Sequence, residues 1–302
     1  MALVSRSAAA QWKVERQGND KVKVLLDGKP FTEYLTKNGA KPTLWPILSP
    51  KGRELTRAYP MRMDEGEKRD HPHQRSLWFT HGDVNGVDFW AEGDGKGTIA
   101  HREFVEVHGG PSAVIQTKND WLGPDGKKQC EDERTLTFSA DGDNRIVDFD
   151  ITIKATDGPV KFGDTKEGTF GIRVPTVMDV TSKKGGHIVN SQGQADDAAW
   201  GKPATWVDYH GPLDGQMMGI AVLNHPSSYG YPTHWHVRTY GLFAANPFGL
   251  HDFKNVKDPI GAYTLPAGES MTIRYRVIFH PGDEKDAKIA EAFDVYSKAA
   301  KK

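Results

Sequence analysis

The chain has 302 residues, and its 39 Lys and Arg side chains nearly balance its 40 Asp and Glu side chains. This balance excludes the strongly basic surface of a typical nucleic-acid-binding protein. The single cysteine, Cys130, excludes an intramolecular disulfide and a cysteine-rich zinc module. No run of about 18 apolar residues marks a membrane-spanning helix.

The N-terminal residues leave the location of the protein open. Residues 1–12 read MALVSRSAAAQW, which is too short and too polar for a complete signal peptide. The stretch AAAQ within it resembles the residues around a signal-cleavage site. The chain is therefore either a periplasmic or secreted protein without its native signal peptide or a cytoplasmic protein. We expect residues 1–20 to be a flexible segment and residues 21–302 to form a single domain.

Short strand-like segments dominate the chain, and its 32 Gly and 18 Pro residues are spread between them as turn formers. From Val147 to Ile153, apolar and polar residues alternate, which predicts a half-buried antiparallel strand. The segment from Met271 to Phe279 alternates in the same way. The predicted strands cover residues 21–26, 31–35, 44–48, 113–118, 134–139, 145–154, 168–174, 219–223, 239–244 and 270–279.

One helix is predicted, over residues 283–301. It begins with an acidic turn, which suits a helix N-terminus, and Ile289, Phe293 and Tyr296 recur at helical spacing. Residues 180–197 are rich in Gly, Ser and Lys, and we expect a surface excursion there. The whole pattern predicts one large, mostly antiparallel β domain with a terminal helix.

Five of the 12 histidines stand in two short segments. The first segment holds His71, His73 and His81, and the second holds His234 and His236. Residues i and i+2 point to the same side of an extended chain. We therefore expect each His-x-His pair to converge on one metal ion or one substrate.

Two kinds of chemistry fit these pairs. In one, His71, His73, His234 and His236 supply neutral imidazole ligands to Cu, Zn or Fe. No Glu follows either pair at the spacing of cupin metal sites. In the other, His is the general acid, Asp or Glu is the base, and Arg and Asn orient the hydroxyl groups of a sugar. A purely structural interpretation also stays open. In it, His71-Pro72-His73 forms a surface turn, and a His-x-His pair packs within a strand against tryptophan.

A second set of residues is expected to complete a sugar site. Glu167 opens a predicted strand between turn residues, where a carboxylate base is well placed, although a solvated turn residue is the alternative. Trp and Tyr offer flat faces to a sugar ring. The expected substrate-binding residues are Arg75, Trp78, Asn85, Arg173, Asp208, Tyr209, Trp235, Arg238 and Asn246. No GxGxxG, P-loop, HExxH or GxSxG motif is present, which disfavours nucleotide-dependent and serine-hydrolase mechanisms.

The segment from His71 to Trp90 resembles a signature of a largely uncharacterised family of bacterial proteins that are often labelled PmoA-like. Residues 163–174, 206–215 and 235–249 resemble the same family, and the likeness extends from about residue 30 to residue 280. The resemblance does not imply methane oxidation. The genuine PmoA subunit is a membrane protein, whereas this sequence contains no predicted membrane span. Members often look like exported proteins of polysaccharide-degrading bacteria, which favours a periplasmic or secreted location.

Residues 265–270, with the sequence LPAGES, are similar to a turn near the end of galactose mutarotases, apart from an intervening Ala267. This resemblance implies a galactose-mutarotase-like supersandwich, which is a large antiparallel β-sandwich. In such enzymes a His is the general acid and a carboxylate is the general base. The resemblance makes His71, His73, His81 or His236 the acid candidate and Glu167 the base candidate.

The function expected from the sequence is that of a carbohydrate-active enzyme that hydrolyses, eliminates or epimerises a sugar or glycoside. One alternative is a His-ligated metalloenzyme, such as an oxidase, with a divalent metal as its cofactor. The other is a non-catalytic glycan-binding protein. In each case the expected partner is a small sugar or a glycan, with no nucleic acid and no membrane span.

Overall fold

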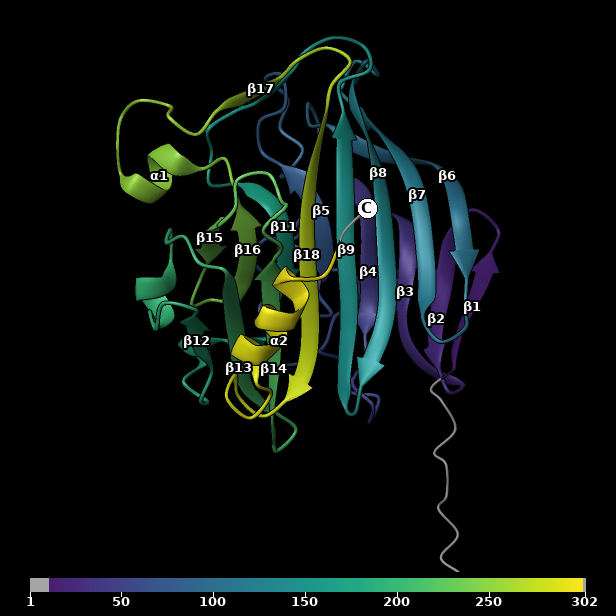
Figure 1. Cartoon of the computed structure of the whole chain (residues 1–302), viewed down its shortest axis with the longest axis vertical. Coiled ribbons are helices and arrows are strands. Elements are labelled where there is room, and N and C mark those ends of the chain that lie inside the picture. The colour runs from purple at the N-terminus through teal and green to yellow at the C-terminus, as the bar shows by residue number, and fades with distance from the viewer. Residues whose placement is uncertain (1–10, 301–302) are drawn as a thin grey trace, which may run out of the picture.

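Two antiparallel sheets of eight strands each lie face to face in the computed structural model, which describes residues 11–300 (Figure 1). In order across the first sheet, the strands are β1 (Trp12–Gln17), β2 (Lys21–Leu26), β3 (Lys29–Asn38), β4 (Lys41–Ile47), β5 (Leu77–His81), β11 (Gly168–Arg173), β16 (Leu242–Asn246) and β15 (His234–Val237). In order across the second sheet, they are β12 (His187–Asn190), β13 (Trp206–Leu213), β14 (Gln216–Asn224), β18 (Ser270–Pro281), β9 (Asn144–Lys154), β8 (Lys128–Asp141), β7 (Ala113–Leu122) and β6 (Thr98–His108). A small third sheet pairs β10 (Val160–Phe162) with β17 (Tyr263–Leu265).

Helices are short. The α-helices are α1 (Leu250–Lys254) and α2 (Ile289–Ser297), and the 3-10 turns are Thr176–Met178, Val180–Ser182 and Asp196–Ala199. In Figure 1, α2 lies over the outer side of β14 and β18, where Ile289 and Tyr296 join an apolar cluster with Trp206. No helix within residues 11–300 is long and apolar enough to span a membrane.

The space between the two large sheets is apolar because their strands alternate. In β9, Val147, Phe149 and Ile151 are buried, while the residues between them are only half-buried. The ring centroid of Phe149 lies 6.1 Å from that of Phe79 and 5.1 Å from that of Phe170, both in the first sheet. Full burial of one such side chain stabilises the fold by about 1.5–3 kcal/mol. The predicted mainly β fold, a large antiparallel β-sandwich with a C-terminal helix, is confirmed.

The N-terminal prediction differs from the structure over β1. This strand pairs with β2 along its whole length, and Trp12 is buried with its ring centroid 5.9 Å from that of Phe31. The sequence WKVERQ carries four polar residues, and the strand forms through its pairing with β2 and the burial of Trp12. The first part of the segment expected to be flexible, residues 1–10, lies outside the described residues.

Two further boundaries differ from the sequence prediction. The helix expected from residue 283 begins at Ile289, because Asp283 Oδ1 instead accepts hydrogen bonds from the backbone N–H groups of Lys285 and Asp286, each at 2.9 Å. Lys288 then takes a left-handed conformation with φ of 53° directly before the helix. The surface excursion expected over residues 180–197 contains a strand, β12, which pairs with β13.

The outer face of the first sheet positions the site described next. Across four neighbouring strands, the register aligns Trp78, Gly171, Ala244 and His236 in one row. Because side chains alternate along each strand, this row faces away from the core that contains Phe79 and Phe170. Gly171 lets the Trp78 ring lie flat against the sheet, since a Cβ at that position would collide with the indole.

Candidate active site

A cavity of about 390 Å³ lies over this outer face. Its walls are residues from three loops, within 71–74, 82–91 and 165–167, and Tyr240 closes one side. The first loop precedes β5 and the second follows it, whereas the third precedes β11. The end of β5 and the start of β11 meet because His81 pairs with Gly168. Antiparallel pairing therefore brings three distant loops to one place.

His71 stands at the edge of this cavity between two aromatic neighbours. Its ring lies parallel to that of Tyr240, with 5.1 Å between centroids and 8° between planes. The ring of His73 is 5.8 Å away, in an edge-on arrangement. The Nδ1 atom of His71 is 3.1 Å from Asp70 Oδ2, and the side chain is 41% exposed. This exposure leaves the ring accessible to a ligand in the cavity.

Asp70 is fixed from below by two buried arginines. Arg57 donates to its Oδ1 at 2.5 Å, and Arg173 donates to both of its oxygens at 2.8 and 3.1 Å. Partial burial alone would raise the pKa of Asp70, but Arg173, Arg57 and His71 lower it to about 2. Asp70 is therefore a fixed carboxylate that orients the His71 ring.

The pKa values of Glu167 and His73 are shifted in opposite directions. Burial raises the pKa of Glu167 above its ordinary value, against the attraction of Lys166, whose Nζ is 3.9 Å away. Burial, assisted by the charge of Lys41, lowers the pKa of His73 to about 4. At neutral pH His73 is therefore neutral, and Glu167 takes up a proton more readily than an exposed carboxyl. Shifts of this kind in a cleft are typical of functional sites.

Aromatic rings form much of the floor. Trp90 is almost completely buried, with its ring centroid 5.4 Å from that of Trp78 and 6.2 Å from that of His73. Trp78, Trp90, Leu242 and Ala244 form an apolar cluster against which Tyr240 packs. Apolar faces beside a few polar groups suit the C–H and O–H faces of a sugar ring.

The second histidine segment shares the same outer face but does not reach the cavity wall. His236 is buried, its Nδ1 accepts a hydrogen bond from Trp200 Nε1 at 2.9 Å, and burial lowers its pKa to about 3. His234 stacks on Phe253 with 5.9 Å between centroids, and burial lowers its pKa to about 4. Both imidazoles are therefore neutral at neutral pH.

Arg238 lies between the two histidine segments. Its guanidinium carbon is 5.8 Å from the ring centroid of Tyr240, which stacks on His71, and 5.6 Å from that of Trp200, which bonds His236. The predicted four-histidine metal site is consequently not formed. Within residues 11–300, the group of three or more ligand atoms close enough to hold a metal is Asp208, His210 and Glu284 instead.

His81 is not brought to the cavity either. It is fully buried, its Nε2 is 2.8 Å from the Gly163 carbonyl oxygen, and its ring packs 5.0 Å from that of Phe248. His81 is two residues from Phe79, so both point from β5 toward the core side of the sheet. Burial lowers the pKa of His81 to about 4.

Three of the predicted substrate-binding residues support the cavity. Arg173 is buried beneath it, bonded to Asp70 and Gln74 and 4.9 Å from the Tyr240 ring. Asn246 is buried and donates to the Thr165 carbonyl oxygen at 2.8 Å, which holds the loop that carries Glu167. Arg238, described above, is the third.

The other predicted substrate-binding residues do not line the cavity. Arg75 forms an ion pair with Glu92 at 2.7 Å, and Asn85 occupies an exposed turn with φ of 53°. The rings of Trp78 and Trp235 are buried. Asp208 and Tyr209 are buried in β13 of the other large sheet. Residue type alone does not distinguish these positions from the residues of the cavity wall.

Sequence reasoning missed several residues of the cavity. Asp88, Trp90, Thr165 and Tyr240 line the cavity and lie inside the segments that were singled out, next to predicted site residues. The sequence feature that could have identified them is their position close to His71, Glu167 or Arg238 along the chain.

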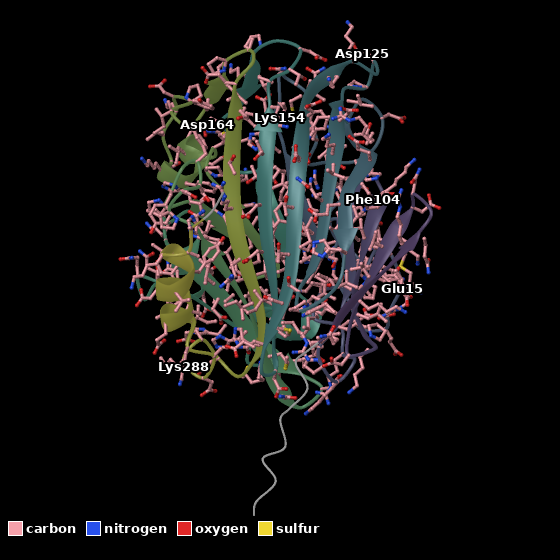
Figure 2. All side chains as sticks on the ribbon, turned by 45° about the vertical axis from the view of Figure 1, so that its right-hand side comes forward. Glu15, Phe104, Asp125, Lys154, Asp164 and Lys288 are labelled. Carbon is pink, nitrogen blue, oxygen red and sulfur yellow. The ribbon has the colours of Figure 1, made fainter. Side chains whose placement is uncertain are left out.

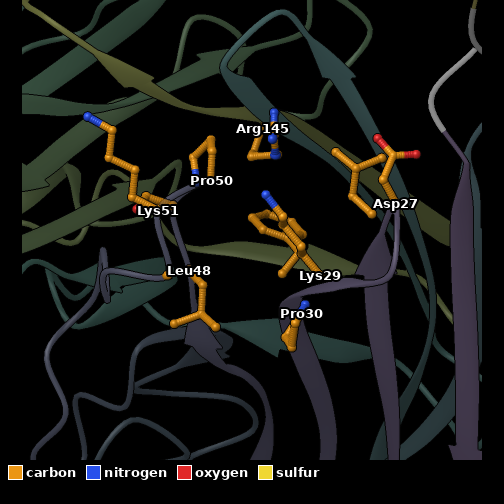
Figure 3. A pocket seen from close by; sticks show the side chains of 11 residues that line it. Asp27, Lys29, Pro30, Leu48, Pro50, Lys51 and Arg145 are labelled. Atoms are coloured by element: carbon orange, nitrogen blue, oxygen red, sulfur yellow. The ribbon is translucent and has the colours of Figure 1, made fainter. Parts of the chain in front are cut away.

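A larger hollow of about 840 Å³ lies elsewhere, near the β2–β3 turn and the start of β9 (Figure 3). Lys29, Lys51 and Arg145 surround it, and its lining includes one carboxylate, Asp27, and no histidine. Asp27 Oδ1 accepts a hydrogen bond from the backbone N–H of Gln11. Size alone favours this hollow, but the smaller cavity holds both imidazoles and carboxylates, so we take the smaller one as the candidate active site.

The fold and the cavity define a mainly β sandwich protein with a site lined by histidines, carboxylates and aromatic rings. The chain belongs to the family of unknown function DUF6807, whose sequence profile matches residues 21–294. No curated protein matches the chain.

Among solved structures, the chain is similar to a galactose mutarotase related enzyme from Lactobacillus acidophilus, with 10% identity, 89% of this chain and 97% of that chain covered, and a TM-score of 0.38. It is also similar to a galactose mutarotase-like protein from Lactobacillus casei, with 9% identity, 89% and 100% coverage, and a TM-score of 0.40. A GH36 α-galactosidase from Geobacillus stearothermophilus shows 12% identity, 94% and 41% coverage, and a TM-score of 0.39.

Proposed function

We propose that this protein is a carbohydrate-active enzyme in which His71 and Glu167 exchange protons with a sugar held in the 390 Å³ cavity. The observation that carries the proposal is that an oriented imidazole and a carboxyl group with a raised pKa line one cavity with aromatic walls. This combination is what general acid–base catalysis at a sugar carbon requires.

Each side chain has a defined part in the proposed chemistry. The Asp70 carboxylate accepts the Nδ1 proton of His71, which leaves Nε2 to exchange a proton with the substrate. Glu167 is the complementary base, because its raised pKa brings it closer to neutral pH. Tyr240 and Trp90 present their rings to the sugar, and neutral His73 hydrogen-bonds a hydroxyl group.

The reaction class consistent with these residues is hydrolysis, elimination or epimerisation of a sugar or glycoside. The separation of the two histidine pairs argues against the metalloenzyme alternative. A non-catalytic glycan-binding protein remains the competing function, since the same aromatic surfaces bind sugars without turnover. A periplasmic or secreted location and the PmoA-like label stay predictions.

The decisive experiment is a turnover screen of neutral sugars and glycosides, followed by NMR in deuterated water to detect exchange at sugar carbons. For a substrate found in this way, we expect His71→Gln and Glu167→Gln each to lower kcat by about 10²–10⁴-fold. The matched control is His108→Gln, at the end of β6, where the histidine has a carboxylate partner, Glu106, but lines no part of the cavity.

Two outcomes would contradict the proposal. Full turnover in both variants would remove His71 and Glu167 from the chemistry. Sugar binding without turnover in the wild type, lost on Trp90→Ala but kept in His71→Gln, would identify a glycan-binding protein instead.

A further inference from the structure

A second group of ionisable side chains lies on the outer face of the other large sheet. Asp208 and His210 are neighbours on one face of β13, and Glu284 reaches them from the turn before α2. One ligand atom from each residue lies within 4.8 Å of the others. Figure 2 shows this region to be separate from the cavity: Lys288, at the end of the turn, lies near the lower end of the molecule, and Asp164, shortly before Glu167, near the upper end.

The Asp208 carboxylate is fixed in a fully buried position. Its Oδ1 is 2.6 Å from His210 Nδ1, and its Oδ2 is 2.7 Å from His280 Nε2 on β18. The His280 ring reaches it by lying across Gly219 of β14, where a Cβ would collide with the imidazole. One carboxylate oxygen is thus occupied by His280, and the other is directed at His210.

The carboxylate of Glu284 lacks a hydrogen-bond donor among the described residues. Its side chain is only 14% exposed, yet its carboxylate accepts no hydrogen bond from the residues that the structure describes. The nearest cationic atoms are His210 Nδ1 at 3.8 Å and Lys285 Nζ at 3.9 Å, and the Lys285 side chain is 86% exposed. A carboxylate largely removed from water is costly without a partner at bonding distance.

Two carboxylates therefore face one imidazole nitrogen. His280 occupies the other oxygen of Asp208, and the exposed Lys285 ammonium lies 3.9 Å from Glu284. Asp283 adds a further carboxylate nearby, and the neighbouring His187 ring, 5.4 Å from that of His210, is paired with Asp196 at 3.0 Å. Within residues 11–300, no lysine or arginine other than Lys285 lies within 4.0 Å of Asp208 or Glu284, and a divalent cation would supply positive charge there.

We infer that Asp208, His210 and Glu284 bind one divalent transition-metal ion, and that mixed N and O ligands select zinc-like ions over magnesium or calcium. The ligand atoms are Asp208 Oδ1, His210 Nδ1 and Glu284 Oε2, with water in the remaining position. The ion takes the place of the proton on Nδ1. That proton leaves to solvent when both ring nitrogens of His210 are protonated, and it moves to Nε2 when the ring is neutral. Because ligands about 2.0–2.2 Å from the metal sit roughly 3.3 Å apart, Asp208 and His210 must separate slightly from their present contact.

The position of the ligands indicates a structural purpose for such an ion. Two ligands belong to β13, and the third belongs to the turn that leads into α2. An ion held by all three fastens α2 to the second sheet, over the apolar cluster of Trp206, Ile289 and Tyr296. This inference is independent of the proposed sugar chemistry, which uses the opposite face of the sandwich.

The test is calorimetric titration of the full chain with ZnCl₂ after removal of metal by a chelator. We expect one ion per chain and a higher midpoint of thermal unfolding. Glu284→Gln lies in a turn and should fold, and we expect it to weaken zinc binding at least tenfold. His210→Gln should act in the same way.

Two control variants separate this group from other sites. Glu106→Gln changes an exposed His–Glu pair, with 3.1 Å between His108 Nε2 and Glu106 Oε1, and should leave zinc affinity unchanged. His71→Gln should also leave it unchanged. The inference is overturned if the folded wild type binds no zinc at micromolar concentrations, or if Glu284→Gln keeps wild-type affinity while His71→Gln loses it.

Discussion

The two outer faces of this sandwich carry the same pair of chemical groups in different surroundings. On one face, His71 lines a cavity and contacts Asp70 at 3.1 Å, and the His71 side chain is 41% exposed. On the other face, His210 and Asp208 lie beneath the turn before α2, with His210 only 7% exposed. The comparison teaches that the surroundings of a His–carboxylate pair decide its possible role. A pair beside an open cavity can exchange protons with a ligand, whereas a pair covered by a turn can hold a metal ion.

The charge states of the two faces differ as well. Beside the cavity, burial lowers the pKa values of His73, His234 and His236, so these rings are neutral. Under the turn, burial alone would also lower the pKa of His210, but Asp208 and Glu284 raise it. Neutral imidazoles suit hydrogen bonding to a neutral ligand, whereas His210 lies beside the carboxylates of Asp208 and Glu284.

The largest effect expected from a single change is on the covered face. Asp208→Asn removes the carboxylate between His210 and His280, and breaking such a buried pair costs about 3–5 kcal/mol. Urea unfolding in the presence of a chelator measures this loss without any contribution from metal. The matched control is Asp125→Asn in an exposed turn, which should change stability very little. A loss below about 1 kcal/mol in Asp208→Asn would show that the group is weakly coupled to the fold.

The pH dependence of stability tests whether the buried His236 on the cavity side is neutral in the folded chain. The pKa of His236 is about 3 in the folded chain against about 6.5 when exposed, so the unfolded chain binds a proton that the folded chain does not. Stability therefore falls as pH drops below about 6.5, by up to roughly 1.4 kcal/mol per pH unit from this residue. Unfolding at pH 7 and pH 5 should show a smaller difference in His236→Gln than in the wild type. An equal difference in both would contradict the neutral buried imidazole.

A pair of glycine variants compares the two faces directly. In both Gly171→Ala and Gly219→Ala the new Cβ meets an aromatic ring, Trp78 in one case and His280 in the other. Overpacking of this kind costs about 1–3 kcal/mol. We expect only Gly171→Ala to weaken sugar binding and only Gly219→Ala to weaken zinc binding, both measured by calorimetry. A variant that changes both affinities would mean that the two faces are coupled through the core.

The smallest effect is expected at the boundary between the histidine segments. Arg238→Leu removes a guanidinium that packs on the rings of Tyr240 and Trp200. Cation–π contacts of this kind contribute about 0.5–1 kcal/mol at exposed sites. Sugar affinity should fall only a few-fold, and a loss beyond about 100-fold would instead make Arg238 a direct ligand of the substrate.

Alternation made some of the fold predictable from sequence. In β9 and β18, one face is apolar and the other polar, so both strands and their buried residues could be predicted. β5, β11 and β16 are buried on both sides, and no alternation separates their two faces. The sequence LWFTH of β5 could not show that His81 points toward the core and Trp78 away from it.

The candidate site could be predicted only in part, because the sequence shows residue types and turns but not which strands pair. His71, His73 and Glu167 were singled out by residue type and by their places in turns, and all three line the cavity. Their meeting depends on the pairing of β5 with β11, whose residues are more than 80 positions apart along the chain. Spacing within one segment carries no information on such a pairing, so His236 and Asp208 could not be separated from the cavity residues in advance.

The loops at the two ends of β5 turn back over the outer face of the sheet. One carries His73 and the other carries Trp90, and their ring centroids lie 6.2 Å apart. The cavity that these loops share has a volume of about 390 Å³. A ligand held by both loops is therefore confined to this space, and we expect a longer glycan to leave its remaining sugar units in solvent.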